Sequence, residues 1–317
     1  MTNIVDMPTL KEIKGRIGSV KSTLKITSAM KLVSSAKLRK AQNAIAAMRP
    51  YEEALQRMLA LSSGSMSESP EEALSSALLR NPVRANAPER ASSGDSVIIA
   101  IASNSSLCGG FNANIIAKVR SVRNEGDVVY SIGRKMADAM GRDGFRSPSD
   151  FSALSEHPAY APAAALVEKL SEDFAEGRVS GVKLVYTHFV STSRQVPVEE
   201  TLLPLQRTPD QVGGDGKSVM PDSASVMPDP DRASDAILEP SAKELLRALL
   251  PKTLKLKLYA ALLDSAAAEH AARTIAMQTA TDNAENLLSE LTLQYNKGRQ
   301  QKITSEILDL AGGQAAE

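Results

Sequence analysis

The feature that most constrains this chain is an unbroken helical pattern near its N-terminus. Thr9 and Glu12 form a capping-box sequence, in which each side chain satisfies a backbone N–H of the other residue, so a helix is expected to begin here. At 1.5 Å per residue, about 50 residues extend roughly 75 Å, far longer than a typical globular helix. Alternating steps of three and four residues define its seam: Leu10, Ile13, Ile17, Val20, Leu24, Thr27, Lys31, Ser34, Leu38, Ala41, Ile45, Met48, Glu52, Leu55 and Leu59.

The middle of this seam is polar, because it contains Thr27, Lys31 and Ser34. Polar seam residues reduce the stability of a coiled coil, so they either fix its register or face a different surface. We favour the second interpretation.

A second helical pattern occupies the other end of the chain. It begins with a Ser/Thr-x-x-Glu signal at Ser241–Glu244 and runs toward Ala311-Gly312-Gly313, and Pro251 is expected to kink it or split off its first turns. Its leucines and isoleucines alternate with many alanines, and such small residues allow a second helix to approach closely. Neither helix is stable alone at this length, so we predict that the two pair in an antiparallel coiled coil.

The segment between the helices alternates strand-like and helical patterns, which indicates a parallel sheet with crossover helices. Strands are predicted at 96–102, 128–132 and 182–189, and helices near 112–124, 134–143 and 161–177. The predicted fold class is therefore α/β, with a long antiparallel coiled coil of N- and C-terminal helices and an inserted Rossmann-like α/β domain. Its predicted domains are an N-terminal coiled-coil helix (1–62), a flexible connection (63–95), the α/β domain (96–205), a flexible insertion (206–240) and a C-terminal coiled-coil helix (241–317).

Composition agrees with paired helices more than with one compact globule. The chain has 317 residues and is 43% hydrophobic but only 3% aromatic, with no Trp. Net charge is zero overall, yet residues 1–50 hold ten Lys and Arg against Asp6 and Glu12. This basic first helix is either a solvated face or a surface for an acidic protein partner; nucleic acid ranks third because no aromatic residues interleave the positive charges.

The cysteine count, the spacing of the histidines and the hydropathy pattern argue against several classes of protein. Cys108 is the only cysteine, so no intrachain disulfide is possible and a reducing compartment fits. His157, His188 and His270 lack ligand spacing, so we expect no metal and no other cofactor. No signal-peptide pattern and no long apolar window is present, so we expect a protein that is neither exported nor inserted in the bilayer.

Two glycine motifs resemble nucleotide sites incompletely. Leu107–Asn112 follows a strand and opens a helix, but a third glycine and an acidic residue after the next strand are missing, and Cys108 has no nearby His as a base. Gly214–Ser218 resembles the end of a P-loop, but Gln211 replaces its first glycine. Glu199-Glu200 and Asp229/Asp231 are explained by solvation, so no catalytic residue is predicted.

The polar stretch Asn296–Thr304 is different, because it interrupts an apolar helix at one position along the rod. Arg299 and Gln300 there suit carboxylates on a partner protein.

Three segments together resemble the gamma subunit of rotary F-type ATP synthases: Lys25–Val33, Leu107–Gly110, and Ala271–Met277 with Ala280–Asn283 through Thr304. The resemblance implies a non-catalytic central shaft that turns inside a hexamer of alpha and beta subunits. Its α/β end stands on the membrane-embedded c-ring with the epsilon subunit, so that proton-driven rotation of the ring is coupled to ATP synthesis or hydrolysis. It also implies a peripheral location on the cytoplasmic face of the bacterial plasma membrane.

The resemblance assigns partner contacts to individual residues. Arg299, Gln300 and Thr304 match family positions that hydrogen-bond the beta subunits' catch loop, and Met30 matches the facing bearing position on the first helix. Lys25 and Glu306 are further candidates.

The chain departs from the family pattern at two places near these motifs. Asn104-Ser105-Ser106 replaces the common Asp-Arg-Gly, so the role of that arginine does not carry over. Gly298 replaces a usual alanine and is expected to weaken the helix by up to about 1 kcal/mol.

Two other functions stay open from the residues alone. One is a nucleotide-binding α/β enzyme that its helices dimerise, and the other is a coiled-coil scaffold with no rotary role. Binding of nucleotide by the isolated chain distinguishes the first, and the identity of its partners distinguishes the second.

Overall fold

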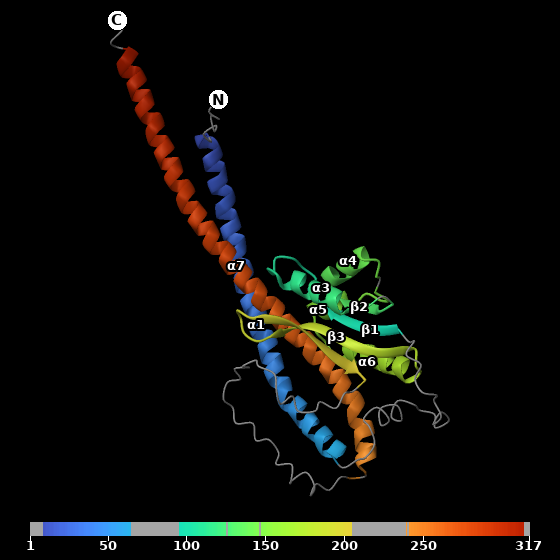
Figure 1. Cartoon of the computed structure of the whole chain (residues 1–317). Helices are drawn as coiled ribbons and strands as arrows, with labels where there is room; N and C mark the ends of the chain where they lie inside the picture. The colour runs from blue at the N-terminus through green and yellow to red at the C-terminus, as the bar shows by residue number, and fades with distance from the viewer. Residues whose placement is uncertain are drawn as a thin grey trace, which may run out of the picture.

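The computed structural model describes residues 9–64, 95–124, 126–145, 147–204, 239 and 241–313. Two long helices, α1 (Leu10–Gly64) and α7 (Ala242–Gly313), lie antiparallel and form a rod from whose side an α/β body projects (Figure 1). The predicted fold class is confirmed. The predicted flexible connection 63–95 and insertion 206–240 lie almost wholly outside the described residues, so the domain boundaries stay a prediction.

The predicted seam of α1 faces α7 along its whole length. The helix begins at the predicted capping box, where the Thr9 N–H donates to Glu12 Oε2 at 2.9 Å and the Glu12 N–H donates to Thr9 Oγ1 at 3.3 Å. Every residue assigned to the seam is buried or half-buried, whereas most positions between them are exposed. On α7, Ala267 and Ala271 are fully buried against Leu38 of α1, and their small side chains let the two backbones approach closely.

The polar middle of the seam serves the pairing itself, so our expectation that it faces a different surface was wrong. Thr27 and Ser34 are 7% and 3% exposed. The hydroxyl oxygens of Thr27 and Thr281 lie 2.9 Å apart, which joins α1 to α7 by a hydrogen bond at one defined level. Unlike apolar contacts, this bond exists in only one register, so it fixes how the helices align.

Of the two outcomes expected at Pro251, a kink or a split of the first turns, the split does not occur, because α7 runs through this residue from Ala242. A helix-interior proline costs about 3 kcal/mol or more. Leu249, Leu250 and Leu254, however, are at most 6% exposed, and burial of one such side chain contributes roughly 1.5–3 kcal/mol. Packing of this turn against its neighbours therefore outweighs the lost backbone hydrogen bond.

The body is built on a four-stranded sheet with strand order β2-β1-β3-β4. The strands are β1 (Asp95–Ile101), β2 (Val128–Ile132), β3 (Val179–Phe189) and β4 (Gln195–Leu203). The first three are parallel as predicted, but β4 pairs antiparallel with β3, so the sheet is mixed. Sequence analysis missed β4 because Pro197, Glu199 and Glu200 interrupt the apolar residues of this mostly half-buried edge strand.

Helices cover both faces of the sheet. The predicted helices are present as α3 (Phe111–Val122), α4 (Arg134–Arg142) and α6 (Tyr160–Ala175), and a short α5 (Ser152–Glu156) was not predicted. One face, with Ile98 and Ala100, packs on α3 and α4. The other face, with Ile99, packs on α6 and on Leu254 and Leu258 of α7. The first half of α7 therefore belongs to the helix pair of the rod and also forms a layer of the body.

The seam also holds a histidine whose protonation opposes folding. His270 of α7 is half-buried, its Nδ1 has no hydrogen-bond partner among the described residues, and burial together with Arg273 and Lys37 lowers its pKa from 6.5 to about 4. In the unfolded chain this imidazole binds a proton near its ordinary pKa. Between these two pKa values the unfolded state therefore binds more protons than the folded state, and stability falls as pH falls.

We predict that the free energy of unfolding lost between pH 7 and pH 5 is smaller in His270→Gln than in the unchanged protein. Urea denaturation at several pH values, followed by helical circular dichroism, measures both. Subtracting the two curves removes the contributions of all other titrating groups. Parallel curves for the two proteins would contradict the assignment.

Candidate functional site

The polar patch predicted at the far end of α7 is exposed except at Gly298 and extends past the pairing with α1. Residues 299–308 are all exposed, and Arg299 and Gln300 have no side-chain partner among the described residues. The first residue of α1, Leu10, lies against Gly298, so of the two helices only α7 extends beyond this level within the described residues (Figure 1). The Arg299 guanidinium and the Gln300 amide are therefore free to donate hydrogen bonds to another protein.

The other two residues assigned to the far end of α7 make only local contacts. Thr304 Oγ1 donates to the Gln300 carbonyl oxygen at 2.9 Å, one turn back. Glu306 lies 3.9 Å from Lys302 in an ion pair whose side chains are more than 60% exposed, so it contributes little stability. Ile303, Ile307 and Leu308 are 47%, 59% and 65% exposed on the same segment. The segment thus presents both apolar and hydrogen-bonding groups to a partner.

Met30 and Lys25 lie at a different level of the rod. Met30 is half-buried and Lys25 is exposed, on either side of Thr27, which contacts Thr281 of α7. Residue 299 is about 27 Å further along α7 at 1.5 Å per residue. The structure therefore separates the six candidate residues into two groups, the α7 end patch (Arg299, Gln300, Thr304 and Glu306) and the α1 patch (Lys25 and Met30).

Gly298 has a packing role that the sequence did not reveal. A Cβ at this position would lie 3.1 Å from Leu10 Cδ2, closer than ordinary van der Waals contact. The missing methyl group lets the first turn of α1 rest directly on α7, and the helix continues through Gly298 without interruption.

The glycine turn after β1 is docked against α7. Cys108 is 1% exposed, and its sulfur accepts a hydrogen bond from Asn112 Nδ2 at 3.1 Å. Gly109 has φ +58, and a Cβ there would contact Ala276 of α7 at 3.8 Å. The turn therefore makes a close approach to the rod, and the buried thiol is a structural group.

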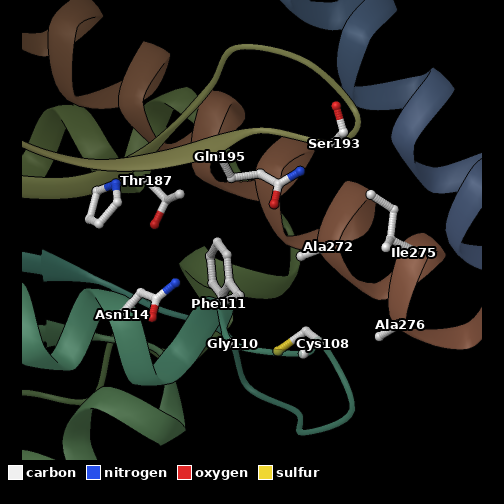
Figure 2. A pocket seen from close by; sticks show the side chains of 12 residues that line it. Cys108, Gly110, Phe111, Asn114, Thr187, Ser193, Gln195, Ala272, Ile275 and Ala276 are labelled. Carbon is white, nitrogen blue, oxygen red and sulfur yellow. The ribbon is translucent and has the colours of Figure 1, made fainter. Parts of the chain in front are cut away.

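A hollow of about 210 Å³ lies beside this turn, between the body and α7. Figure 2 shows Phe111, Thr187 and Gln195 of the body on one side and Ala272, Ile275 and Ala276 of α7 on the other. None of its lining residues is charged, so it lacks the cationic groups that hold nucleotide phosphates. The P-loop-like Gly214–Ser218 and the pair Asp229/Asp231 lie outside the described residues.

Charged side chains join the body to α7 next to this turn. Asp264 of α7 accepts hydrogen bonds from the Phe189 N–H at 3.0 Å and pairs with His188 Nδ1. Burial raises the pKa of Asp264, although His188 partly offsets the effect. Further along, Arg273 pairs with Glu269 at 2.7 Å, and burial raises the pKa of Glu269 despite this cation.

Sequence analysis did not identify Asp264, Glu269 or Arg273 as functional. The available signal was the presence of charged residues within an alanine-rich helix. Within the described ranges, no three His, Cys, Asp or Glu side chains are placed to hold a metal ion. In the same part of the chain, no helix is long and apolar enough to cross a membrane.

Known proteins match this chain along nearly its whole length. A family model described as "ATP synthase" matches residues 9–316. The ATP synthase gamma chain of Phocaeicola vulgatus is 44% identical over 319 residues, covering 98% of this chain and 100% of the relative. The gamma chain of Bacteroides thetaiotaomicron is 42% identical over 316 residues, covering 97% and 99%.

A solved structure shares the fold. A chain in the mitochondrial ATP synthase assembly of Euglena gracilis that comprises OSCP, F1 and the c-ring superposes with a TM-score of 0.61 at 18% identity, covering 97% of this chain and 94% of that one.

Alanine substitutions at two glycines should have opposite effects on stability, because Gly109 has a left-handed backbone conformation and Gly141 a helical one. Gly109→Ala places a side chain at a left-handed backbone position and should destabilise the protein by roughly 1–2 kcal/mol. Gly141→Ala, inside α4 with nothing within 4 Å of the added Cβ, should stabilise it by about 0.5–1 kcal/mol. Urea denaturation of both variants measures the difference, and equal effects would contradict the described turn.

Proposed function

The chain belongs to the ATP synthase gamma-chain family, and from this premise we propose that it is the central rotor shaft of an F-type ATP synthase. In this role it is a non-catalytic subunit that links rotation of a membrane-embedded c-ring to ATP synthesis or hydrolysis in a hexamer of alpha and beta subunits. The epsilon subunit accompanies its α/β end. The rod is the observation that carries the proposal. The family match over residues 9–316 includes both of its helices.

The rod has the mechanical form that such a role requires. The 72 residues of α7 extend about 108 Å at 1.5 Å per residue. Its pairing with α1 stiffens the middle, and its packing on the sheet anchors the end that bears the body. Torque applied at the body therefore reaches the far end through continuous hydrogen-bonded helix.

The two groups of candidate residues supply contacts for the surrounding subunits. In the α7 end patch, Arg299 and Gln300 donate hydrogen bonds to carboxylate or carbonyl oxygens on a beta-subunit catch loop, with Thr304 beside them. In the α1 patch, Met30 bears on the hexamer with Lys25 near it. Their separation along the rod places one contact near the far end and the other nearer the body.

The body is directed toward the membrane, and the protein is peripheral on the cytoplasmic face of the bacterial plasma membrane. The alternative of an enzyme dimerised by its helices has less support, because α1 and α7 bury their seams against each other within one chain. The uncharged hollow beside Cys108 also offers no phosphate site.

Reconstitution tests the proposed role. Alpha and beta subunits are purified together with and without this chain, and ATPase activity is measured. We expect activity to collapse when the chain is omitted and to return when it is added. Full activity of a stable alpha–beta assembly without the chain would overturn the proposal.

The α7 end patch makes a sharper prediction. Because Arg299 and Gln300 have no partner within the described part of the chain, Arg299→Ala with Gln300→Ala should leave its stability within about 0.5 kcal/mol. Loss of two hydrogen bonds, one charge-assisted, should reduce ATP-driven proton pumping in membrane vesicles about 10-fold or more.

Lys169→Ala with Glu172→Ala is the matched control, because it removes two exposed side chains from α6 of the body. It should pump normally. Pumping at the unchanged rate in the Arg299/Gln300 variant would contradict the assigned contact.

A further inference from the structure

The body is joined to α7 by two kinds of contact at two ends of their interface. Up to Leu262, the contact is an apolar core shared with the sheet and α6, with ion pairs from Lys255 to Glu168 and from Lys257 to Glu200 at its margin. Beyond this residue, the body reaches α7 through smaller contacts that include Phe111 against Ala268 and the side chain of Arg273. Arg273 therefore lies near the far edge of the body, where leverage between the body and the rod is greatest.

Both terminal nitrogens of the Arg273 guanidinium make polar contacts. Nη1 lies 2.7 Å from Glu269 Oε1, one turn back on α7, while Nη2 donates to Ser105 Oγ at 2.8 Å and approaches the Ser106 carbonyl oxygen at 3.5 Å. Arg273 and Glu269 are each 8% exposed. The ion pair within the helix thus fixes the guanidinium with one nitrogen directed at the body.

Buried ion pairs are weak sources of stability, because desolvation offsets most of their attraction. Their geometry, however, is strict, since a guanidinium donates along fixed directions. An apolar interface has no such directionality and permits small sliding movements. The Arg273 contact therefore adds to the interface a resistance to sliding that its leucines do not provide.

The segment that receives this contact is held rigidly within the body. The Ser105 carbonyl oxygen accepts hydrogen bonds from Ser103 Oγ at 2.6 Å and from Asn112 Nδ2 at 3.3 Å. Ser103 follows β1, and Asn112 lies in the first turn of α3. The residue that Arg273 contacts, Ser105, is therefore hydrogen-bonded both to the end of a strand and to a helix.

The backbone of the same segment is constrained. Leu107 has φ +66, which is a genuine outlier for a bulky residue. Its side chain is 58% exposed, so burial of this side chain does not compensate the strain. Such a conformation persists only where surrounding contacts determine it, and the hydrogen bonds on both sides of Leu107 do so.

We propose that Arg273, oriented by Glu269, is a positioning residue that locks residues 105–107 of the body to α7, so that body and rod turn as one unit. The proposal rests on the rotor function, because only a rotating shaft requires this junction to resist torque.

Ser105 variants test the lock without disturbing the buried ion pair. Ser105→Ala removes the acceptor, whereas Ser105→Thr retains it at an exposed position that tolerates a methyl group. Loss of a hydrogen bond to a charged donor should raise amide hydrogen exchange at 104–108 about 10-fold in the isolated chain. Exchange in the paired parts of α1 and α7 should not change.

The functional readout is the number of protons pumped per ATP hydrolysed by the assembled complex. We expect this ratio to fall in Ser105→Ala, because a loosened junction permits slippage between body and rod, and to be normal in Ser105→Thr. Arg273→Lys, which replaces the two terminal guanidinium nitrogens with a single ammonium nitrogen, should lower it, and adding Ser105→Ala to that variant should lower it no further. Arg178→Ala removes an exposed ion pair with Asp173 on the body surface and should leave the ratio unchanged.

Unchanged exchange at 104–108 in Ser105→Ala would overturn the lock. Increased exchange with a normal pumping ratio would overturn its role in rotation, leaving only a structural contact. Failure of the unsubstituted chain to restore activity to alpha and beta subunits would instead refute the rotor function, and the exchange measurement on the isolated chain is independent of that result.

Discussion

The packing of α7 on two different partners at once is the interaction on which this structure depends. Leu254 and Leu258 are buried under the sheet, while Ala267 and Ala271, a few turns further, are buried in the seam with α1. One continuous helix thus belongs to the body and to the rod. Because helical backbone hydrogen bonds run without a break between these two regions, no flexible linker separates them on this side of the molecule.

The change from leucine to alanine along α7 follows from what each region must accommodate. A sheet and a helix pack at a distance that large side chains fill, whereas two long helices in close contact need small ones. The alanine-rich stretch of the seam has few large side chains to fix its register, and polar groups contribute to that role. The hydrogen bond between Thr27 and Thr281 is one such group, and Gly298 beneath Leu10 is a steric counterpart.

Polar contacts recur wherever body and rod could slide against each other. Asp264 binds the end of β3, and Arg273 binds the segment after β1. Apolar contacts hold these surfaces together but specify position weakly, while hydrogen bonds to charged groups specify position at little net gain in stability. A shaft that transmits torque has use for both. The α7 end patch is the opposite case, because its hydrogen-bonding groups have no partner within the described residues and are available to other subunits.

The sequence alone determined the parts of this protein that follow from periodicity and local chemistry. It identified the capping box at Thr9, the complete seam of α1 and the three parallel strands, because these depend on residues close together in the chain. It did not identify β4, a half-buried edge strand whose position depends on β3. It left open whether Pro251 kinks α7 or splits off its first turns, and the helix continues because buried leucines from a distant packing interface outweigh the local cost of proline.

The candidate site divides in the same way. The exposed Arg299 and Gln300 were identified from the sequence because a polar interruption of an apolar helix is a local signal. Only the tertiary structure showed that the α1 patch lies about 27 Å from them at 1.5 Å per residue. Likewise, Arg273 and Ser105 are 168 residues apart in the chain, and no local pattern can show that two such residues meet. Their contact exists because the sheet packs on α7 in one orientation, and only the folded chain fixes that orientation.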